Sequence, residues 1–298
     1  MSLGSIYLKL KQRYQHGLRP LYYMEKVRPR ILDTVPMENT VNDACELHVL
    51  TWKGDWLNVI WMLKSLIHFG EIDYKLCIHE DGSLGQYEIE TIQKHFPAAR
   101  VIDRGKADSD LTHRLRGLPR SLEYRRQNPL ALKVYDFSFY LESDRMLLLD
   151  SDILFFSRPV VLLDRIANVE YKLNSFNKDW TNGYSIDHSR VSPTLDFRFP
   201  ELINSGLGLL HKGVVDIDQC EEFLGLPDIM SHHHRIEQTL IALCASKSGF
   251  EFLPGEYDVH LDDFVIHHCE RHFTGPIRHR MYSEGIRHLV KQNFLESL

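Results

Sequence analysis

From residue 45 onward, apolar positions follow two alternating patterns. Short segments rich in large or β-branched apolar side chains are typical of buried strands, and longer segments with apolar residues three and four positions apart are typical of helices. The predicted strands are 46–52, 74–80, 99–103, 145–156, 206–212 and 262–270. The predicted helices are 55–70, which ends at Gly70 as a C-cap, 84–96, 130–142, 217–226 and 235–247. This alternation predicts an α/β fold with a mainly parallel sheet covered on both faces.

The first 40 residues have a different composition. Lysine and arginine outnumber the acids there, and Ile6, Leu10 and Tyr14 recur at helical spacing, which predicts a short basic amphipathic helix. We interpret residues 1–40 as a basic N-terminal arm packed on its own domain, with peripheral contact to an anionic membrane or a partner as the alternative. Residues 41–298 contain no repeat or linker-like tract, which predicts a single domain.

Composition narrows the class of protein. With 43% apolar and 26% charged residues the chain is typical of a globular protein, and its net charge of −6 gives no reason to expect nucleic-acid binding. The five cysteines are scattered without a C-x-x-C pair, which is typical of reduced thiols in the cytoplasm. We find neither an apolar run of about 20 residues nor a signal-peptide core, so the protein is expected to be cytoplasmic.

The most apolar run of the chain, 146–156, contains Asp150 and Asp152. Buried carboxylates are costly unless they are paired or bound to a metal. At the carboxyl end of a parallel strand, where ligands bind in such sheets, two acids one residue apart can converge on one Mg²⁺ or Mn²⁺ that holds a diphosphate. Two loop acids capping a turn are one alternative. A phosphatase nucleophile of the haloacid-dehalogenase type is another, disfavoured by Leu154 where that motif has Thr or Val.

A second segment supplies what such a metal site requires. His272, Gly275 and Arg278 form H-x-x-G-x-x-R: an imidazole for the metal, a glycine that permits close backbone approach, and a cation for phosphates. The pair His267–His268 competes with His272 as the third metal ligand, because it lies directly at the end of the last predicted strand.

Taken in order, five features resemble the GT-A glycosyltransferases, most of all family 8, which includes glycogenin and bacterial lipopolysaccharide sugar transferases. They are the apolar strand with D-x-D, Lys133 in the helix before it, "PELINSGLGLL" at 200–210, "IEQTLIAL" at 236–243 and "HFTGPIR" at 272–278. They span roughly residues 46–282. The resemblance implies a GT-A, Rossmann-like nucleotide-diphospho-sugar transferase fold, with a central, mainly parallel mixed sheet flanked by helices.

The resemblance also implies roles for individual residues. Asp150, Asp152 and His272 would bind Mn²⁺ or Mg²⁺. The implied catalytic residues, beside the donor sugar, are Asn204, Glu237 and Gln238. The residues implied to bind the nucleotide-sugar donor are Thr51, Asp81, Lys133, Asp150, Ser151, Gly206, Gly275 and Arg278, with the base held around His48–Trp52.

The implied function is metal-dependent transfer of a sugar from a nucleotide-diphosphate sugar, a UDP-sugar, to an unidentified glycan, lipid or protein acceptor, with retention. Glu237 and Ile203 replace the family's usual Asp and Phe, so stereochemistry stays open, and an inverting reaction would need a carboxylate base such as Glu237 or Glu201. One alternative is a sugar-phosphate nucleotidyltransferase, disfavoured by the single glycine in "TWKGDW" at 51–56. The other is an inactive GT-A scaffold or sugar-binding module.

The segment 104–129 carries seven lysines and arginines against three acids. We interpret it either as a charged surface loop or as a lid whose arginines close on the donor diphosphate.

Overall fold

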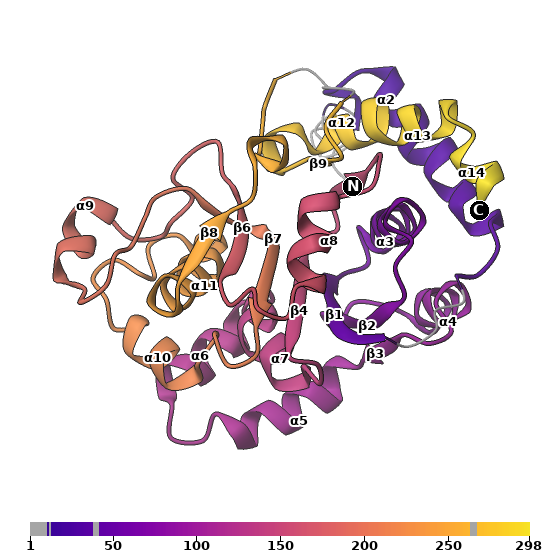
Figure 1. Cartoon of the computed structure of the whole chain (residues 1–298). Helices are drawn as coiled ribbons and strands as arrows, with labels where there is room; N and C mark the ends of the chain where they lie inside the picture. The colour runs from indigo at the N-terminus through magenta and orange to yellow at the C-terminus, as the bar shows by residue number, and fades with distance from the viewer. Residues whose placement is uncertain (1–10, 12, 38–41, 263–266) are drawn as a thin grey trace.

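The computed structural model describes residues 11, 13–37, 42–262 and 267–298. Within them, a seven-stranded sheet has the order β3-β2-β1-β4-β7-β6-β8 (Figure 1). Its strands are β1 (Asn42–Thr51), β2 (Tyr74–Glu80), β3 (Arg100–Ile102), β4 (Arg145–Leu149), β6 (Asn174–Lys178), β7 (Ile203–His211) and β8 (Phe250–Phe252). β1 to β4 are mutually parallel, β7 is antiparallel to both β4 and β6, and β8 is parallel to β6. The predicted mainly parallel sheet is therefore confirmed.

Helices cover both faces of this sheet. One face carries α3 (Trp56–Gly70), α4 (Gln86–His95) and α8 (Val160–Ala167). The other carries α5 (Arg104–Arg114), α6 (Pro119–Gln127), α7 (Ala131–Tyr140), α10 (Ile217–Phe223) and α11 (Ile236–Ser248). Alternate residues of β4 enter opposite hydrophobic clusters: Leu147 and Leu149 face α3, and Met146 and Leu148 face α7. Burial on both faces explains why this strand is apolar throughout.

The predicted strand 145–156 is wrong as a single element. β4 ends at Leu149, the chain turns at 150–152, and β5 (Ile153–Phe155) leaves the main sheet to pair antiparallel with β9 (Glu270–His272). Backbone hydrogen bonds fix the turn, from Asp150 N to Gly206 O at 2.8 Å and from Phe273 N to Asp152 O at 2.8 Å. The two acids therefore lie between two sheets and not along one strand.

The segment 104–129 is also not a long loop or a lid. It forms α5 and α6, which pack on the sheet through Leu111, Leu115 and Tyr124, each at most 1% exposed. Arg125, one of its basic residues, is buried and holds Asp136 of α7 through two hydrogen bonds of 2.8 Å. This arginine therefore forms part of the core and does not face a ligand site.

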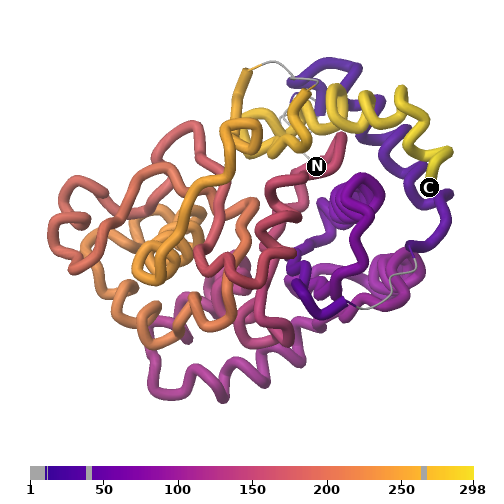
Figure 2. Tube along the Cα trace, in the orientation of Figure 1, coloured from indigo at the N-terminus to yellow at the C-terminus, as the bar shows by residue number. Residues whose placement is uncertain are grey.

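The N-terminal segment lies against the C-terminal helices (Figures 1 and 2). A short helix, α9 (His188–Val191), lies between β6 and β7 in the chain. The other α-helices of the described residues are α2 (Leu18–Tyr22), near the N-terminus, and α12 (Arg278–Arg280), α13 (Arg287–Lys291) and α14 (Phe294–Ser297), near the C-terminus. Val27 and Ile31 belong to the hydrophobic cluster that also contains the buried side chains of α3, and Trp61 of α3 donates through Nε1 to Arg28 O at 2.9 Å. Ile6 and Leu10 of the predicted amphipathic helix lie outside the described residues.

Smaller differences concern element ends. The predicted C-cap of α3 is wrong by one residue: Gly70 is the last residue of the helix, and Glu71 is the C-cap, with a left-handed backbone (φ 51°). The predicted strand 262–270 lies partly outside the described residues, and β9 begins only at Glu270. All five cysteines are free, as predicted, and all five are buried. In the part of the chain that the structure describes, no helix combines the length and the apolar character needed to cross a membrane.

Candidate active site

A cavity of about 780 Å³ opens where β1 and β4 end and β7 begins. This is the carboxyl edge of the parallel strands, where the sequence predicted the ligand site. The wall residues used below come from β1 and the loop after it (Leu50, Trp52, Asp55), the turn after β4 (Asp150, Ser151), the loop after β6 (Asp179, Trp180), β7 (Asn204, Ser205), α11 (Glu237, Gln238) and the segment from β9 to α12 (His272, Gly275, Arg278).

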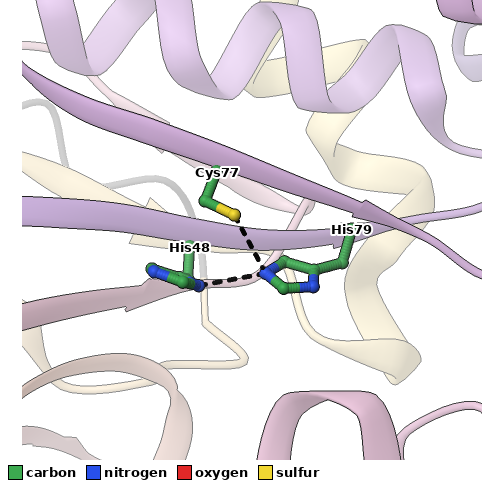
Figure 3. A group of neighbouring side chains, drawn as sticks. All are labelled: His48, Cys77 and His79. Carbon is green, nitrogen blue, oxygen red and sulfur yellow. Dashed lines mark hydrogen bonds between the residues drawn. The ribbon is translucent and has the colours of Figure 1, made fainter. Parts of the chain in front are cut away.

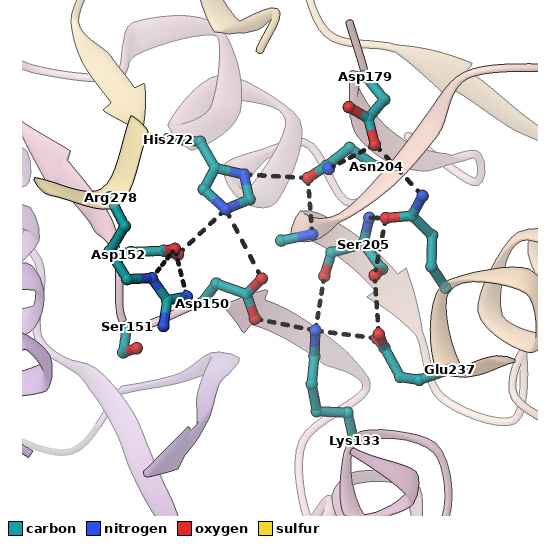
Figure 4. Close-up of polar contacts among 12 residues, drawn as sticks. Lys133, Asp150, Ser151, Asp152, Asp179, Asn204, Ser205, Glu237, His272 and Arg278 are labelled. Atoms are coloured by element: carbon teal, nitrogen blue, oxygen red, sulfur yellow. Dashed lines mark hydrogen bonds and ion pairs between the residues drawn. The ribbon is translucent and has the colours of Figure 1, made fainter. Parts of the chain in front are cut away.

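Three potential metal ligands meet in this cavity (Figure 4). One ligand atom each from Asp150, Asp152 and His272 lies within 4.8 Å of the others, and His272 Nε2 is 3.1 Å from Asp152 Oδ1 and 3.7 Å from Asp150 Oδ2. The β5–β9 pairing brings them together, because it places Ile153 opposite His272. His267 and His268 are not in this group, and His268 lies beside His260.

The donor set fits a divalent cation. Apart from its ion pair with His272, Oδ1 of buried Asp152 has no hydrogen-bond donor among the described residues. Two carboxylates and one imidazole form a ligand set that Mn²⁺ or Mg²⁺ accepts in proteins. Burial lowers the pKa of His272, but the carboxylates of Asp152, Asp150 and Glu270 together outweigh burial and raise this pKa to about 9. A bound cation would therefore take the place of a proton on His272.

Arg278 completes this side of the cavity. Its Nε and Nη2 donate to Asp152 Oδ2 at 3.0 and 2.6 Å, while 45% of the side chain stays exposed. Although burial opposes ionisation of Asp152, His272 and Arg278 together hold the pKa of that carboxyl well below its usual range. Arg278 can thus bind Asp152 and still face an anion in the cavity.

On the opposite side of the cavity, Lys133 lies between Asp150 and Glu237. Its ammonium group is buried and lies 2.9 Å from Asp150 Oδ1, 2.9 Å from Glu237 Oε1 and 3.2 Å from Ser205 O. Lys133 donates hydrogen bonds to Asp150 and to Ser205 O and forms an ion pair with Glu237. Ser205 Oγ also donates to Glu237 at 3.2 Å. Lys133 therefore positions Asp150, and the Glu237 carboxylate is held in place by Lys133 and Ser205.

A chain of amides orients His272. Asn204 Oδ1 accepts from Gly206 N at 2.9 Å and lies 3.1 Å from His272 Nδ1, so Nδ1 carries the hydrogen and Nε2 faces the acids. Asp179 Oδ2 accepts from Asn204 Nδ2 at 3.0 Å and from Gln238 Nε2 at 3.3 Å. The predicted residues Asn204 and Gln238 are thus joined through Asp179.

Gly206 makes room for the imidazole. A Cβ at this position would lie 2.7 Å from His272 Nδ1 and 2.9 Å from Asn204 Oδ1, which is too close for real atoms. Gly275 differs, because a Cβ there would meet no protein atom within 4 Å. No described part of the protein therefore requires a glycine at position 275, and the predicted need for a glycine there would come only from the phosphates of a bound donor.

The structure places several predicted donor residues away from the cavity. Thr51 is fully buried and its hydroxyl donates to Asp55 Oδ1 at 3.2 Å. Asp81 is not among the cavity's lining residues and accepts from Ser83 Oγ at 2.5 Å. His48 is fully buried on the α7 face of the sheet. Ser151 lines the cavity, and its hydroxyl donates to Asp55 at 2.5 Å.

The cavity residues missed from the sequence include Trp52, Asp55, Asp179 and Trp180. Trp52 lay within the stretch proposed to hold the base but was not singled out, and the two indoles are each 48% exposed. Asp179 and Trp180 belong to the segment 172–199, which carries no recognisable motif.

No family profile and no curated protein sequence matches this chain. Among solved structures it is similar to the galactosyltransferase LgtC in complex with donor and acceptor sugar analogues, at 14% identity and a TM-score of 0.56 over 85% of this chain and 96% of that one. It is also similar to mouse xyloside xylosyltransferase 1 (12%, TM-score 0.48, 78% and 98% covered) and to core-mannan synthase A of Aspergillus fumigatus in its Mn/GDP form (8%, 0.47, 74% and 76%). The likeness to LgtC shows that the chain has the GT-A glycosyltransferase fold, as the sequence predicted.

Proposed function

We propose that the protein is a metal-dependent glycosyltransferase that takes a sugar from a nucleotide-diphosphate sugar, a UDP-sugar as in the family 8 enzymes it resembles. The observation that carries this proposal is the convergence of Asp150, Asp152 and His272 beside Arg278 in one cavity. A diphosphate requires a cation clamp, and these four side chains offer the metal ligands together with a fixed guanidinium.

Each residue then has a distinct task. Asp150, Asp152 and His272 would hold Mn²⁺ or Mg²⁺, which supplies charge neutralisation to the diphosphate when bound. Arg278 would stabilise the negative charge that develops on the departing nucleoside diphosphate. Asn204 keeps the His272 tautomer that leaves Nε2 free for a metal. Gln238, whose amide is bonded to Asp179 and Ser205, would border the donor sugar from the cavity wall.

The state of the carboxylates favours transfer with retention. An inverting reaction needs a free carboxylate base near the acceptor. Glu237 is buried and paired with Lys133, and Glu201 lines a different cavity. Asp55 is bonded to Ser151, and Asp179 already accepts two amide hydrogens. The carboxylates of the described cavity walls are therefore all engaged.

The two alternative functions receive less support. A nucleotidyltransferase needs an open glycine-rich loop after the first strand, whereas a Cβ on Gly54 would collide with the Trp52 indole, which fills that space. An inactive scaffold has no need of two acids, an imidazole and a guanidinium held in register.

Thermal-shift measurements with nucleoside diphosphates, with and without Mn²⁺, test the proposal. We expect stabilisation only when both are present, strongest with UDP. Asp152→Asn should abolish both this shift and donor hydrolysis, while Asp144→Asn, an exposed acid just before β4, should change neither. Full donor hydrolysis by Asp152→Asn, or a wild-type protein that ignores every diphosphate with Mn²⁺, would refute the function.

A further inference from the structure

A second group of side chains that could bind a metal ion lies on the α7 face of the sheet, outside the donor cavity (Figure 3). It consists of His48 on β1 and of Cys77 and His79 on β2. The parallel register places His48 opposite Cys77, and the alternation of β2 puts Cys77 and His79 on the same face. Phe137 of α7 covers both imidazoles, with ring centroids 5.2 and 4.5 Å away. All three side chains are at most 1% exposed.

The three potential ligand atoms point at one another. His79 Nε2 lies 3.0 Å from His48 Nδ1 and 3.3 Å from Cys77 Sγ, and all three atoms lie within 4.8 Å. Around one ion with bonds of about 2.0 Å to nitrogen and about 2.3 Å to sulfur, such atoms stand roughly 3.3–3.6 Å apart. The two distances from His79 Nε2 are within a few tenths of an ångström of these values, and the distance from His48 to Cys77, at most 4.8 Å, would have to shorten by about 1 Å at most.

Without an ion, the hydrogen bonds of this cluster conflict. His79 Nε2 contacts both His48 Nδ1 and Cys77 Sγ, but one ring nitrogen either accepts one hydrogen or donates one. If it donates to His48, the Cys77 thiol has no acceptor, and if it accepts from one neighbour, the other is left out. Polar groups left unsatisfied in a protein core are costly.

Glu46 favours the His48 tautomer that metal binding requires. Its carboxylate lies 3.5 Å from His48 Nε2, which has no hydrogen-bond partner among the described residues, and its negative charge favours a hydrogen on Nε2 and a lone pair on Nδ1, toward the cluster. Arg100 and the backbone N–H of Glu142, at 2.8 Å, hold Glu46 in place. A carboxylate behind a ligating imidazole is the usual support of protein metal sites.

We propose that His48, Cys77 and His79 form a buried site for one thiophilic cation, Zn²⁺ or Cu⁺, that ties β1 to β2. Binding removes one proton, from the thiol, and moves the hydrogen of His79 to Nδ1, which is buried and has no hydrogen-bond partner among the described residues, so that three lone pairs face the ion. One thiolate and two neutral imidazoles suit both ions. With Cu⁺ the set is three-coordinate and electrically neutral, which lowers the cost of burial. Because the site is closed to solvent, the ion enters during folding.

Metal content measured after folding tests the proposal. The protein is refolded under reducing conditions with Zn²⁺ or with Cu⁺, dialysed against EDTA to remove accessible ions, and examined by elemental analysis. We expect about one equivalent of at least one ion per chain in the wild type and in Asp152→Asn, which lacks the donor-site carboxylate. Cys77→Ala should lose it, whereas Cys45→Ala, which removes a buried thiol of β1 outside the cluster, should keep it.

Two outcomes overturn the site. One is less than a tenth of an equivalent of either ion in wild-type protein with native circular dichroism. The other is a folded Cys77→Ala variant with the wild-type metal content. If Cys77→Ala does not fold, the wild-type stoichiometry decides the question by itself.

Discussion

Gly206→Ala is the most selective perturbation of the candidate active site that the structure offers. The new methyl group would collide with His272 Cε1 and would lie 2.7 Å from His272 Nδ1 and 2.9 Å from Asn204 Oδ1, and Gly206 is not one of the residues that line the donor cavity. Gly206 lies in β7 and does not have a positive φ, so alanine fits its backbone. The substitution therefore acts on the position of His272.

The size of the effect follows from this distance. The atom nearest to the new methyl group is His272 Cε1, which is closer than Nδ1. Heavy atoms in contact settle at about 3.5–4.0 Å, so the imidazole has to retreat by at least about 1 Å. A displacement of that size costs about 100-fold in rate when the displaced group orients the reacting parts. Disturbing the support of a metal ligand costs about 10- to 100-fold in metal affinity. Overpacking of the buried site should destabilise the fold by about 1–3 kcal/mol.

Mn²⁺ titration and donor hydrolysis measure the two effects separately. We expect Gly206→Ala to bind Mn²⁺ about 10- to 100-fold more weakly. Gly275→Ala is the matched control, because its methyl group meets no protein atom within 4 Å and should leave Mn²⁺ affinity unchanged. If Gly206→Ala binds Mn²⁺ within twofold of the wild type, His272 is not a metal ligand and the site has been misinterpreted.

Three further predictions concern other buried charges. Glu237→Gln should lower the free energy of unfolding by about 1–3 kcal/mol, because Lys133 loses a charged partner. The rate of donor hydrolysis should fall less than about tenfold. A fall in this rate of more than 1,000-fold in folded protein would instead identify Glu237 as a catalytic base. Burial lowers the pKa of His95 to about 4 from 6.5, so the unfolded state takes up a proton first and stability is lost as pH falls from 6.5 towards 4. At pH 4.5 this loss is about 2.5 kcal/mol, and urea unfolding at pH 7 and 4.5 should show it in the wild type but not in His95→Gln. Arg125→Met should destabilise by about 3–5 kcal/mol by leaving Asp136 buried without its partner; Arg125→Met with Asp136→Leu should recover most of this, and urea unfolding that finds no recovery would contradict the pairing.

The order of strands and helices was predictable because both faces of the sheet are buried. Runs such as 74–80 are apolar enough to be identified alone, and that range matches β2 residue for residue. The break at 150–152 was not predictable, since the residues on both sides are equally apolar. Only pairing with β9, more than a hundred residues away, shows that the chain leaves the sheet there.

The helices of 104–129 were missed for a different reason. Their buried residues, such as Leu111, Leu115 and Tyr124, are few and stand among many charges, so the helical period is weak. The charges themselves suggested a loop. In the fold, part of that charge is neutralised internally, since Arg104 and Arg125 both bind Asp108 at 2.7 Å.

The cavity residues divide in the same way. Asp150, Asp152, His272 and Arg278 could be assembled from the sequence, because each belongs to a motif with fixed spacing. Asp179 could not, since its role comes from accepting hydrogens from Asn204 and Gln238, which lie on two other elements. Motif spacing reveals residues that act as a local group, whereas partners contributed by separate loops become visible only in the fold.

The charges of the site explain why two acids can stand inside so apolar a run. Three carboxylates, Asp150, Asp152 and Glu237, face two permanent cations, Lys133 and Arg278, and the high pKa of His272 supplies the third positive charge when no metal is bound. The charges of these six groups therefore balance, which makes their burial tolerable. A divalent cation that displaces the His272 proton would add one positive charge to this group, in a cavity where Arg278 is already exposed. The same arrangement that stabilises the empty site thus attracts a diphosphate once the metal is bound.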